Sequence, residues 1–172
     1  RALILSDIHA NLEALEAVLE DAQTRGGFDS VWCLGDTVGY GPDPGACIDR
    51  IREFDLLAVT GNHDCAAVGL IDASDFNDAA KAAAEWTASQ LNTGQREFLK
   101  ELPMVVKESS FTLVHGSLRA PIVEYLLDRN SAAGTFGLME TSYCFVGHSH
   151  IPFMCRDAAE GPDFLDLALD EQ

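Results

Sequence analysis

Five short apolar runs in this chain each lead into a cluster of Asp, Asn, His or Gly. The runs are rich in aliphatic, β-branched and aromatic residues, which predicts buried β-strands. In α/β proteins the carboxyl ends of strands form the crevice where ligands bind, because loops there tolerate polar groups while the sheet stays rigid. We therefore expect the five clusters to converge in space; they occupy residues 7–9, 35–36, 61–64, 115–116 and 147–150.

The first half of the chain alternates strands with helices, which predicts an α/β fold. Strands are expected at residues 2–5, 30–34 and 56–60, and helices at 12–22, 44–52, 77–91 and 93–101. The second half predicts a hairpin of residues 104–107 and 111–114, a helix at 131–139, strands at 143–146, 151–156 and 164–169, and a mobile turn at 157–163. Without an internal repeat or low-complexity linker, we expect a single domain over residues 1–172.

The net charge limits the partners that the chain is expected to bind, and the cysteine content indicates the compartment in which it is expected to occur. A net charge of −17, with only 11 Lys and Arg, argues against binding to a nucleic-acid duplex or an anionic membrane. The apolar runs are too short to span a bilayer and no signal peptide opens the chain, so we expect a cytoplasmic protein. Five cysteines without a C-x-x-C pair indicate free thiols in a reducing compartment. An anionic substrate would need bound cations to reverse the local charge.

The chain's entire histidine complement lies in the polar clusters: His9, His63, His115, His148 and His150. A single histidine at a strand end is usually an ordinary polar residue, but the joint pattern indicates a metal centre, since histidine is the commonest ligand of transition metals. Asp7 with His9, and His148 with His150, are two residues apart, so each pair projects from one face of an extended segment and is able to chelate.

Taken in order, the motifs D-x-H, G-D, G-N-H-D, H-G and G-H-S-H resemble those of the calcineurin-like metallophosphoesterase superfamily, from Asp7 to His150. Residues 39–44, 115–119 and 124–126 resemble its small single-domain bacterial branch of phosphodiesterases and phosphatases. The resemblance implies a four-layer α/β/β/α sandwich of two mixed β-sheets flanked by helices. That branch usually continues with further C-terminal strands, whereas this chain runs from Arg1, without a methionine, to Gln172, so we expect a trimmed version of a longer protein.

The same resemblance implies a binuclear centre. One divalent ion would be held by Asp7, His9 and His150, and the other by Asn62, His115 and His148, with Asp36 bridging the two. A metal-bridging hydroxide would then attack phosphorus. Mn²⁺ or Fe is favoured, and Zn²⁺, Co²⁺ or Ni²⁺ is compatible with the same mixed ligand set.

Four further residues are candidates by resemblance or chemistry. His63 would face the leaving-group oxygen, and Asp64 would orient His63 and favour its charged form, although an aspartate there could equally cap the following turn. Arg119 would clamp a substrate phosphate or form an exposed salt bridge. Tyr40 would stack on a substrate ring or pack its own loop.

The sequence therefore predicts a hydrolase for a small phosphoester. A phosphodiester or phosphoanhydride is preferred, because basic residues that would neutralise a monoester are sparse near the motifs. The alternatives are a phosphomonoesterase or protein phosphatase that uses the same centre, and a non-catalytic metal-binding scaffold. A nuclease is disfavoured by the negative charge.

Overall fold

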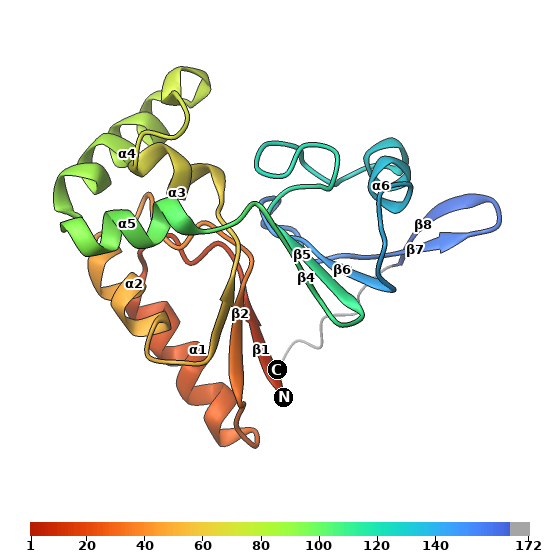
Figure 1. Cartoon of the computed structure of the whole chain (residues 1–172), viewed down its shortest axis with the longest axis horizontal. Coiled ribbons are helices and arrows are strands. Elements are labelled where there is room, and N and C mark those ends of the chain that lie inside the picture. The colour runs from red at the N-terminus through yellow and green to blue at the C-terminus, as the bar shows by residue number, and fades with distance from the viewer. Residues whose placement is uncertain (166–172) are drawn as a thin grey trace.

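The computed structural model describes residues 1–165 and arranges them in layers (Figure 1). Strands β1 (Ala2–Leu5), β2 (Ser30–Cys33) and β3 (Leu56–Ala58) form a parallel sheet in that order. Helices α1 (Leu12–Thr24), α2 (Pro44–Ile51), α3 (Asn62–Ala67), α4 (Asp78–Gln90) and α5 (Thr93–Glu101) lie on one side of this sheet, with the short helix η1 (Ala73–Asp75) before α4.

The second sheet lies on the other side of the first. Strand β4 (Val105–Glu108) pairs antiparallel with β5 (Phe111–Val114), which pairs in parallel with β6 (Tyr143–Phe145). Helix α6 (Arg129–Phe136) and the hairpin of β7 (Met154–Ala158) and β8 (Gly161–Leu165) lie beyond this sheet (Figure 1). The expected mixed α/β fold with helices outside two sheets is therefore confirmed. Within residues 1–165, mixed pairing occurs in the second sheet, while the first sheet is parallel throughout.

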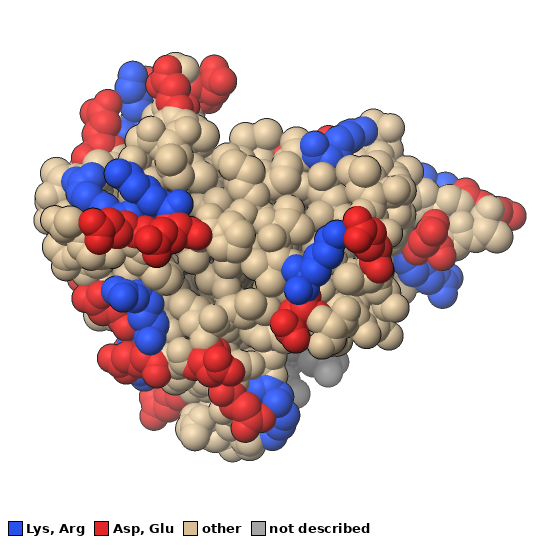
Figure 2. All heavy atoms as spheres, in the orientation of Figure 1, with Lys and Arg blue, Asp and Glu red and all other residues tan. Residues whose placement is uncertain are grey.

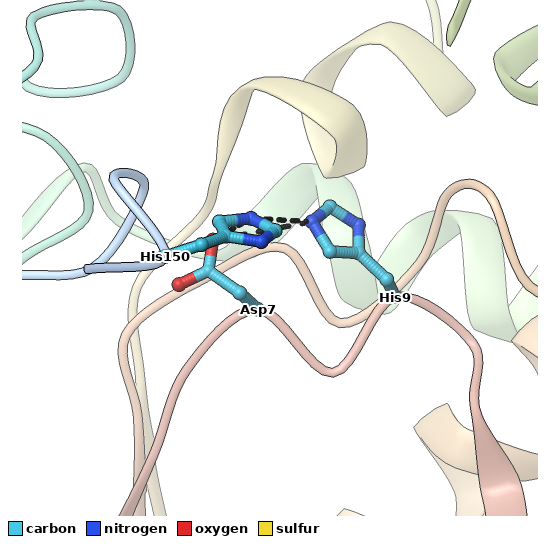
Figure 3. Close-up of side chains that lie close together, drawn as sticks. All are labelled: Asp7, His9 and His150. Atoms are coloured by element: carbon cyan, nitrogen blue, oxygen red, sulfur yellow. Dashed lines mark hydrogen bonds and ion pairs between the residues drawn. The ribbon is translucent and has the colours of Figure 1, made fainter. Parts of the chain in front are cut away.

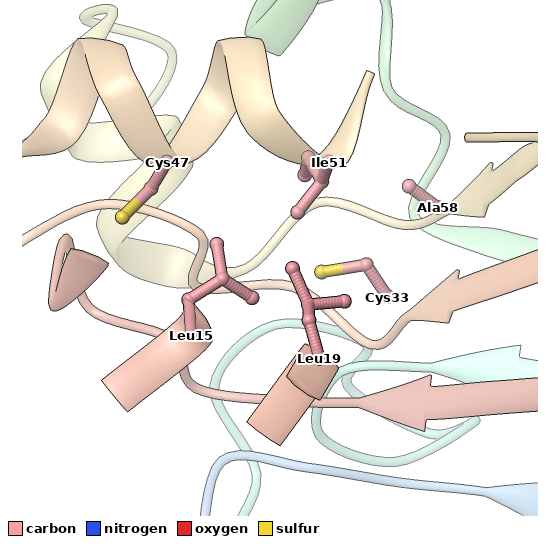
Figure 4. Packing of buried hydrophobic residues seen from close by; sticks show 6 residues of the cluster. All are labelled: Leu15, Leu19, Cys33, Cys47, Ile51 and Ala58. Atoms are coloured by element: carbon pink, nitrogen blue, oxygen red, sulfur yellow. The ribbon is translucent and has the colours of Figure 1, made fainter. Parts of the chain in front are cut away.

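Two apolar layers hold these elements together. Leu15 and Leu19 of α1 meet Ile51 of α2 over the first sheet, with Cys33, Cys47 and Ala58 completing the buried cluster (Figure 4). Between the two sheets, Leu34 and Val59 pack against Leu113 of β5. Because both faces of β2 and β3 are buried in this way, the loops at their carboxyl ends are fixed in position.

The expected element boundaries need three corrections. Residues 62–67 were expected in a loop but form α3, since they lack the length and periodicity that reveal a helix in sequence. The expected mobile turn at 157–163 is largely β-strand, because β7 and β8 pair from Met154 with Leu165 to Ala158 with Gly161. The strand expected at 164–169 is found as far as Leu165, and its remainder lies outside the described residues.

Charged side chains lie mainly over the helices, where acidic and basic residues alternate, and the central part of the face in Figure 2 carries few of either. Many of these charges are exposed ion pairs, such as Arg25 with Asp21. No helix in the described part of the chain is long and apolar enough to cross a membrane. All five cysteines are free thiols, and three of them are buried.

The turn between β4 and β5 offers a test of backbone strain. Ser109 has φ of 55°, whereas Ser110 does not adopt a positive φ. A two-residue hairpin turn with a positive φ at its first position favours glycine there. We expect Ser109→Gly to raise the free energy of unfolding by about 0.5–1 kcal/mol, because the relief of left-handed strain exceeds the added chain entropy of glycine. Ser110→Gly is the matched control and should lower it; a denaturant titration that ranks the two variants in the reverse order would contradict this explanation.

Candidate metal centre

The loops that follow the strands are fastened to one another by backbone hydrogen bonds. The Asp7 N–H donates to the Gly35 carbonyl at 3.1 Å, and the His9 N–H donates to the Asp36 carbonyl at 2.9 Å. In the second sheet the Gly147 N–H donates to the His115 carbonyl at 2.7 Å. The polar clusters after β1 and β2 therefore lie side by side, as do those after β5 and β6.

A further contact joins the two sheets. The His148 backbone N–H donates to both carboxylate oxygens of Asp7, at 3.2 and 3.1 Å. The Ser6 hydroxyl donates to Asp7 Oδ2 at 2.5 Å. Asp7 is thus held by His148 of the second sheet and by the preceding residue, Ser6. Ser6 was not among the residues expected at the site. A serine before an aspartate carries no signal by itself.

The first ligand group consists of Asp7, His9 and His150, whose side chains point toward one another (Figure 3). His9 Nε2 and His150 Nε2 are 3.2 Å apart, and His150 Nε2 is 3.3 Å from Asp7 Oδ1. Asp7 and His9 come from the loop after β1, and His150 comes from the loop after β6, so the group forms only when the two sheets meet.

The second ligand group consists of Asp36, His115 and His148, and all three residues are buried. His115 Nε2 is 3.3 Å from Asp36 Oδ2 and 3.1 Å from His148 Nδ1. Asn62, the first residue of α3, places its Oδ1 3.2 Å from the same His115 nitrogen. The structure therefore brings together all seven residues that the sequence analysis assigned to metal binding.

Asp36 belongs to the second group and also faces the first. Its Oδ2 is 3.3 Å from His115 Nε2 in the second group and 3.8 Å from His9 Nε2 in the first. Its Oδ1 accepts a hydrogen bond from the His63 backbone N–H at 2.9 Å. One oxygen is thus fixed by the backbone, and the other faces both groups.

The chemistry of these donors fits divalent cations. His115 Nδ1 lies 2.8 Å from the Leu34 carbonyl and His9 Nδ1 lies 3.2 Å from the Val38 carbonyl, so each donates its Nδ1 proton there. In the neutral rings, the Nε2 lone pairs are then directed at carboxylate oxygens and at other imidazole nitrogens. Converging lone pairs repel one another unless a positive charge lies between them, and this arrangement is typical of histidine ligands oriented by backbone carbonyls.

The electrostatics of the second group agree with this requirement. Burial lowers the pKa of His115, but its hydrogen bond and ion pair with Asp36 outweigh burial and raise that pKa to about 9. Burial raises the pKa of Asp36, but the contacts of Asp36 with His115 lower it, and the net result is a pKa below the usual value. The two pKa shifts show that a positive charge beside the buried Asp36 carboxylate is stabilising. A divalent cation would supply such a charge.

Backbone strain is concentrated at the same residues. Among the described residues, eight other than glycine have positive φ, and five of them belong to the ligand groups: Asp7, His9, Asp36, His148 and His150. Each such conformation costs about 1–3 kcal/mol and persists only where the surroundings enforce it. Strain gathered at converging polar side chains supports a candidate functional site. The sequence does not reveal this strain, because Asp and His are not residues that require the conformation.

His63 lies beside the ligand groups, at the start of α3. Its ring packs at 5.0 Å from His9, 4.5 Å from Tyr40 and 4.9 Å from Phe76, measured between ring centroids. Burial lowers the pKa of His63 to about 4, so the imidazole is neutral near pH 7. Its Nδ1 is buried without a hydrogen-bond partner in the described part of the chain.

Asp64 does not orient His63, which corrects the expected role. Its carboxylate accepts hydrogen bonds from the Val38 and Gly61 backbone N–H groups, both at 3.1 Å. Gly61 is the N-cap of α3, so Asp64 binds the start of its own helix and not the turn that follows it, which was the alternative interpretation. Burial raises the pKa of Asp64 to about 7, and the nearby Asp36 charge adds to that increase. The sequence placed Asp64 next to His63, but the helical turn directs the two side chains to different partners.

The two candidate substrate contacts are placed differently. The Arg119 guanidinium pairs with Glu124, including Nε to Oε1 at 3.1 Å, so the alternative of an exposed salt bridge describes its contacts in this structure. The Tyr40 ring lies beside the first group, with its centroid 4.9 Å from that of His9. Tyr40 is therefore positioned next to the candidate metal centre, and Arg119 is engaged elsewhere.

Gly61 allows Asp36 to take the position in which it faces both groups. A Cβ at residue 61 would overlap both Asp36 Oδ1 and the Asp36 backbone nitrogen. We expect Gly61→Ala to lower the free energy of unfolding by about 1–3 kcal/mol, because the backbone must shift to remove the overlap. Displacement of Asp36 should also weaken Mn²⁺ binding by about 10- to 100-fold, measured by calorimetry.

Gly94→Ala provides the matched control. In α5, the nearest atom to a Cβ at residue 94 is Asn92 Oδ1 at 3.5 Å, an ordinary contact. This substitution should stabilise the protein by about 0.5–1 kcal/mol without affecting Mn²⁺ binding. Equal Mn²⁺ affinities for the Gly61→Ala and Gly94→Ala variants would show that residue 61 does not control the position of Asp36.

Comparison with known proteins agrees with the fold. Residues 1–163 match the model of the calcineurin-like phosphoesterase superfamily domain. An uncharacterized protein of Methanocaldococcus jannaschii is 37% identical over 174 residues, which cover 95% of this chain and 70% of that protein. The crystal structure of a metallophosphoesterase from Sphaerobacter thermophilus superposes with a TM-score of 0.81 at 42% identity, covering 96% of this chain and 68% of that one.

A more local similarity involves an enzyme that acts on nucleotides, as its name states. A symmetrical bis(5'-nucleosyl)-tetraphosphatase of Psychromonas ingrahamii is 36% identical over 63 residues, which are 36% of this chain and 23% of that protein. The family match spans nearly all of the described residues and includes both ligand groups. The chain belongs to the calcineurin-like phosphoesterase superfamily.

Proposed function

We propose that this protein is a phosphoester hydrolase that depends on two divalent metal ions. The observation that carries the proposal is the position of Asp36 Oδ2, which faces His115 of one ligand group and His9 of the other. When bound, two such ions supply Lewis-acid polarisation of a phosphoryl oxygen and a water molecule acidic enough to act as the nucleophile. Membership of the superfamily supports the general reaction, and the ligand groups support the cofactor.

In this proposal each ligand has a defined task. Asp7, His9 and His150 would hold one ion, and Asn62, His115 and His148 would hold the other. Asp36, whose Oδ1 accepts a hydrogen bond from the His63 backbone N–H, would contribute to both. The Leu34 and Val38 carbonyls keep the His115 and His9 rings in the tautomer that leaves Nε2 free to bind a cation.

His63 is the residue of this cluster without a ligand role. Its neutral ring retains one N–H donor, and the ring lies beside that of His9 in the first ligand group. We assign it to the leaving-group oxygen, where a hydrogen-bond donor stabilises developing negative charge. Asp64 supports this arrangement only indirectly, by holding the start of α3.

A phosphodiester or phosphoanhydride fits the charges better than a monoester. The charges of two divalent ions, Asp7, Asp36 and a hydroxide nucleophile would sum to one positive charge, which balances a singly charged phosphodiester better than a doubly charged monoester. Arg119, the basic residue considered for a further phosphate contact, is paired with Glu124. The local similarity to a bis(5'-nucleosyl)-tetraphosphatase also favours a phosphoanhydride. Mn²⁺ or Fe is the proposed metal, since imidazole, carboxylate and amide ligands suit both.

Metal analysis combined with a substrate panel tests the proposal. We expect two equivalents of divalent metal after reconstitution with Mn²⁺, and Mn²⁺-dependent hydrolysis that is faster for bis(4-nitrophenyl) phosphate and dinucleoside polyphosphates than for 4-nitrophenyl phosphate and phosphopeptides. Preference for the monoesters would favour a phosphomonoesterase. Two bound metals without hydrolysis of any compound in the panel would favour the non-catalytic scaffold.

A further inference from the structure

Two exposed tyrosines flank the ligand groups from opposite loops. Tyr40, in the loop after β2, packs at 4.9 Å from the His9 ring, and 51% of its surface is exposed. Tyr125, in the loop before α6, stacks on the His148 ring at 4.0 Å with an interplanar angle of 17°, and 55% of its surface is exposed. Each ligand group therefore has one partly exposed aromatic ring against one of its histidines.

The position of Tyr40 is enforced by its surroundings. Its φ is 62°, a conformation that is unusual for a bulky residue. The Gly41 N–H donates to the His9 carbonyl at 3.0 Å, and a Cβ at Gly39 would clash with the His63 ring. Packing of its own loop, the alternative interpretation of Tyr40, does not require half of the residue's surface to remain exposed beside the ligand groups.

The loop that carries Tyr125 is also anchored. The Glu124 carboxylate accepts hydrogen bonds from the buried Ser117 hydroxyl at 2.6 Å and from Arg119 Nε at 3.1 Å. The Gly116 N–H donates to the Pro121 carbonyl at 2.6 Å. These contacts give Arg119 and Glu124 a positioning role, because they anchor the loop that places Tyr125 over His148.

Tyr143, the third tyrosine of the chain, is also exposed but lies away from the two ligand groups. Tyr143 begins β6, at the end of the strand away from His148, and stacks on Phe111 at 5.3 Å. The ring beside Tyr143 belongs to another residue of the same sheet, whereas the rings beside Tyr40 and Tyr125 include histidines of the candidate metal centre. Apolar side chains next to Tyr125 are exposed as well, including Val123 and Leu127.

We propose that Tyr40 and Tyr125 form a binding site for a planar ring of the substrate, so that the enzyme selects phosphoesters or phosphoanhydrides bearing an aryl group or nucleobase. The inference rests on the proposed function, because it takes the substrate phosphate to bind at the ligand groups. Ring stacking is an uncharged form of recognition that tolerates different bases, and it suits a chain with a net charge of −17 and few basic residues.

Binding of a matched pair of ligands tests this site. AMP and ribose 5-phosphate share the sugar phosphate and differ in the base. We expect Mn²⁺-loaded wild-type protein to bind AMP about tenfold more tightly than ribose 5-phosphate by calorimetry, since one stacked base contributes about that much. Tyr125→Leu should reduce this ratio of Kd values toward 1, and Tyr40→Leu should also reduce it. Tyr125→Phe, which keeps the ring, should retain the ratio, and so should Tyr143→Leu, the control for an exposed tyrosine.

Hydrolysis of bis(4-nitrophenyl) phosphate, measured on the same samples, separates this inference from the proposed function. A wild-type ratio near 1, or a ratio that survives both leucine substitutions at 40 and 125, would overturn the ring-binding site even if hydrolysis is rapid. Loss of the ratio in those variants supports the site even if no phosphoester is hydrolysed, in which case the proposed function alone fails. Thermal unfolding of each variant checks that the change in ratio does not arise from partial unfolding.

Discussion

Asp36→Asn is expected to lower kcat/KM for a phosphodiester by about 1,000-fold or more, since a loss of several kcal/mol of metal-dependent stabilisation gives a change of that size. Asparagine keeps the shape of the side chain and an oxygen that accepts the His63 backbone hydrogen bond. It removes the charge of Oδ2, which lies 3.3 Å from His115 Nε2 and 3.8 Å from His9 Nε2. Both ligand groups should therefore weaken together.

Metal content and thermal unfolding measure this effect independently of turnover. A ligand that binds only the folded protein raises its stability, so Mn²⁺ should raise the Tm of the wild type more than that of Asp36→Asn. Asp21→Asn is the matched control, because Asp21 forms an exposed ion pair with Arg25 on α1, away from the ligand groups. Asp36→Asn that retained two Mn²⁺ ions and a tenth or more of wild-type kcat/KM would refute the bridging role.

The convergence of the ligand groups was predictable from the sequence because it depends on strand order. Parallel strands end at the same edge of a sheet, so residues that follow β1, β2 and β3 must lie near one another. The pairing of Asp7 with His150 was predictable only through the family resemblance. It depends on how the second sheet docks, which the structure achieves through the His148 N–H and the Leu34, Val59 and Leu113 layer.

Features that depend on local backbone geometry were not predictable. Asp64 was expected to orient His63, but α3 begins at Asn62 and turns the Asp64 carboxylate toward the Gly61 and Val38 N–H groups. Tyr125 was likewise missed as a site residue, because its stacking on His148 depends on a loop anchored by Glu124. Helical phase and loop anchoring arise from tertiary contacts, and no short motif encodes them.

His63→Ala is expected to slow turnover strongly while both metals stay bound. The link between residue 63 and Asp36 is a backbone N–H to Oδ1 contact, which alanine retains. Loss of the ring removes the donor beside the first ligand group, and the absence of a positioned donor or acid costs about 100- to 10,000-fold in kcat. Elemental analysis should therefore still find two metals in a variant that is nearly inactive.

The dependence on the leaving group distinguishes a role at the leaving oxygen from a structural role of the ring. An alkoxide needs more stabilisation than 4-nitrophenolate, so His63→Ala should lose more activity with an alkyl phosphodiester than with bis(4-nitrophenyl) phosphate. Phe76→Leu is the matched control, because Phe76 packs on the His63 ring at 4.9 Å and offers no donor; any loss it causes should be the same for both substrates. Wild-type turnover of both substrates by His63→Ala would refute the assigned role. An equal loss with both would show that the ring shapes the site without contacting the leaving group.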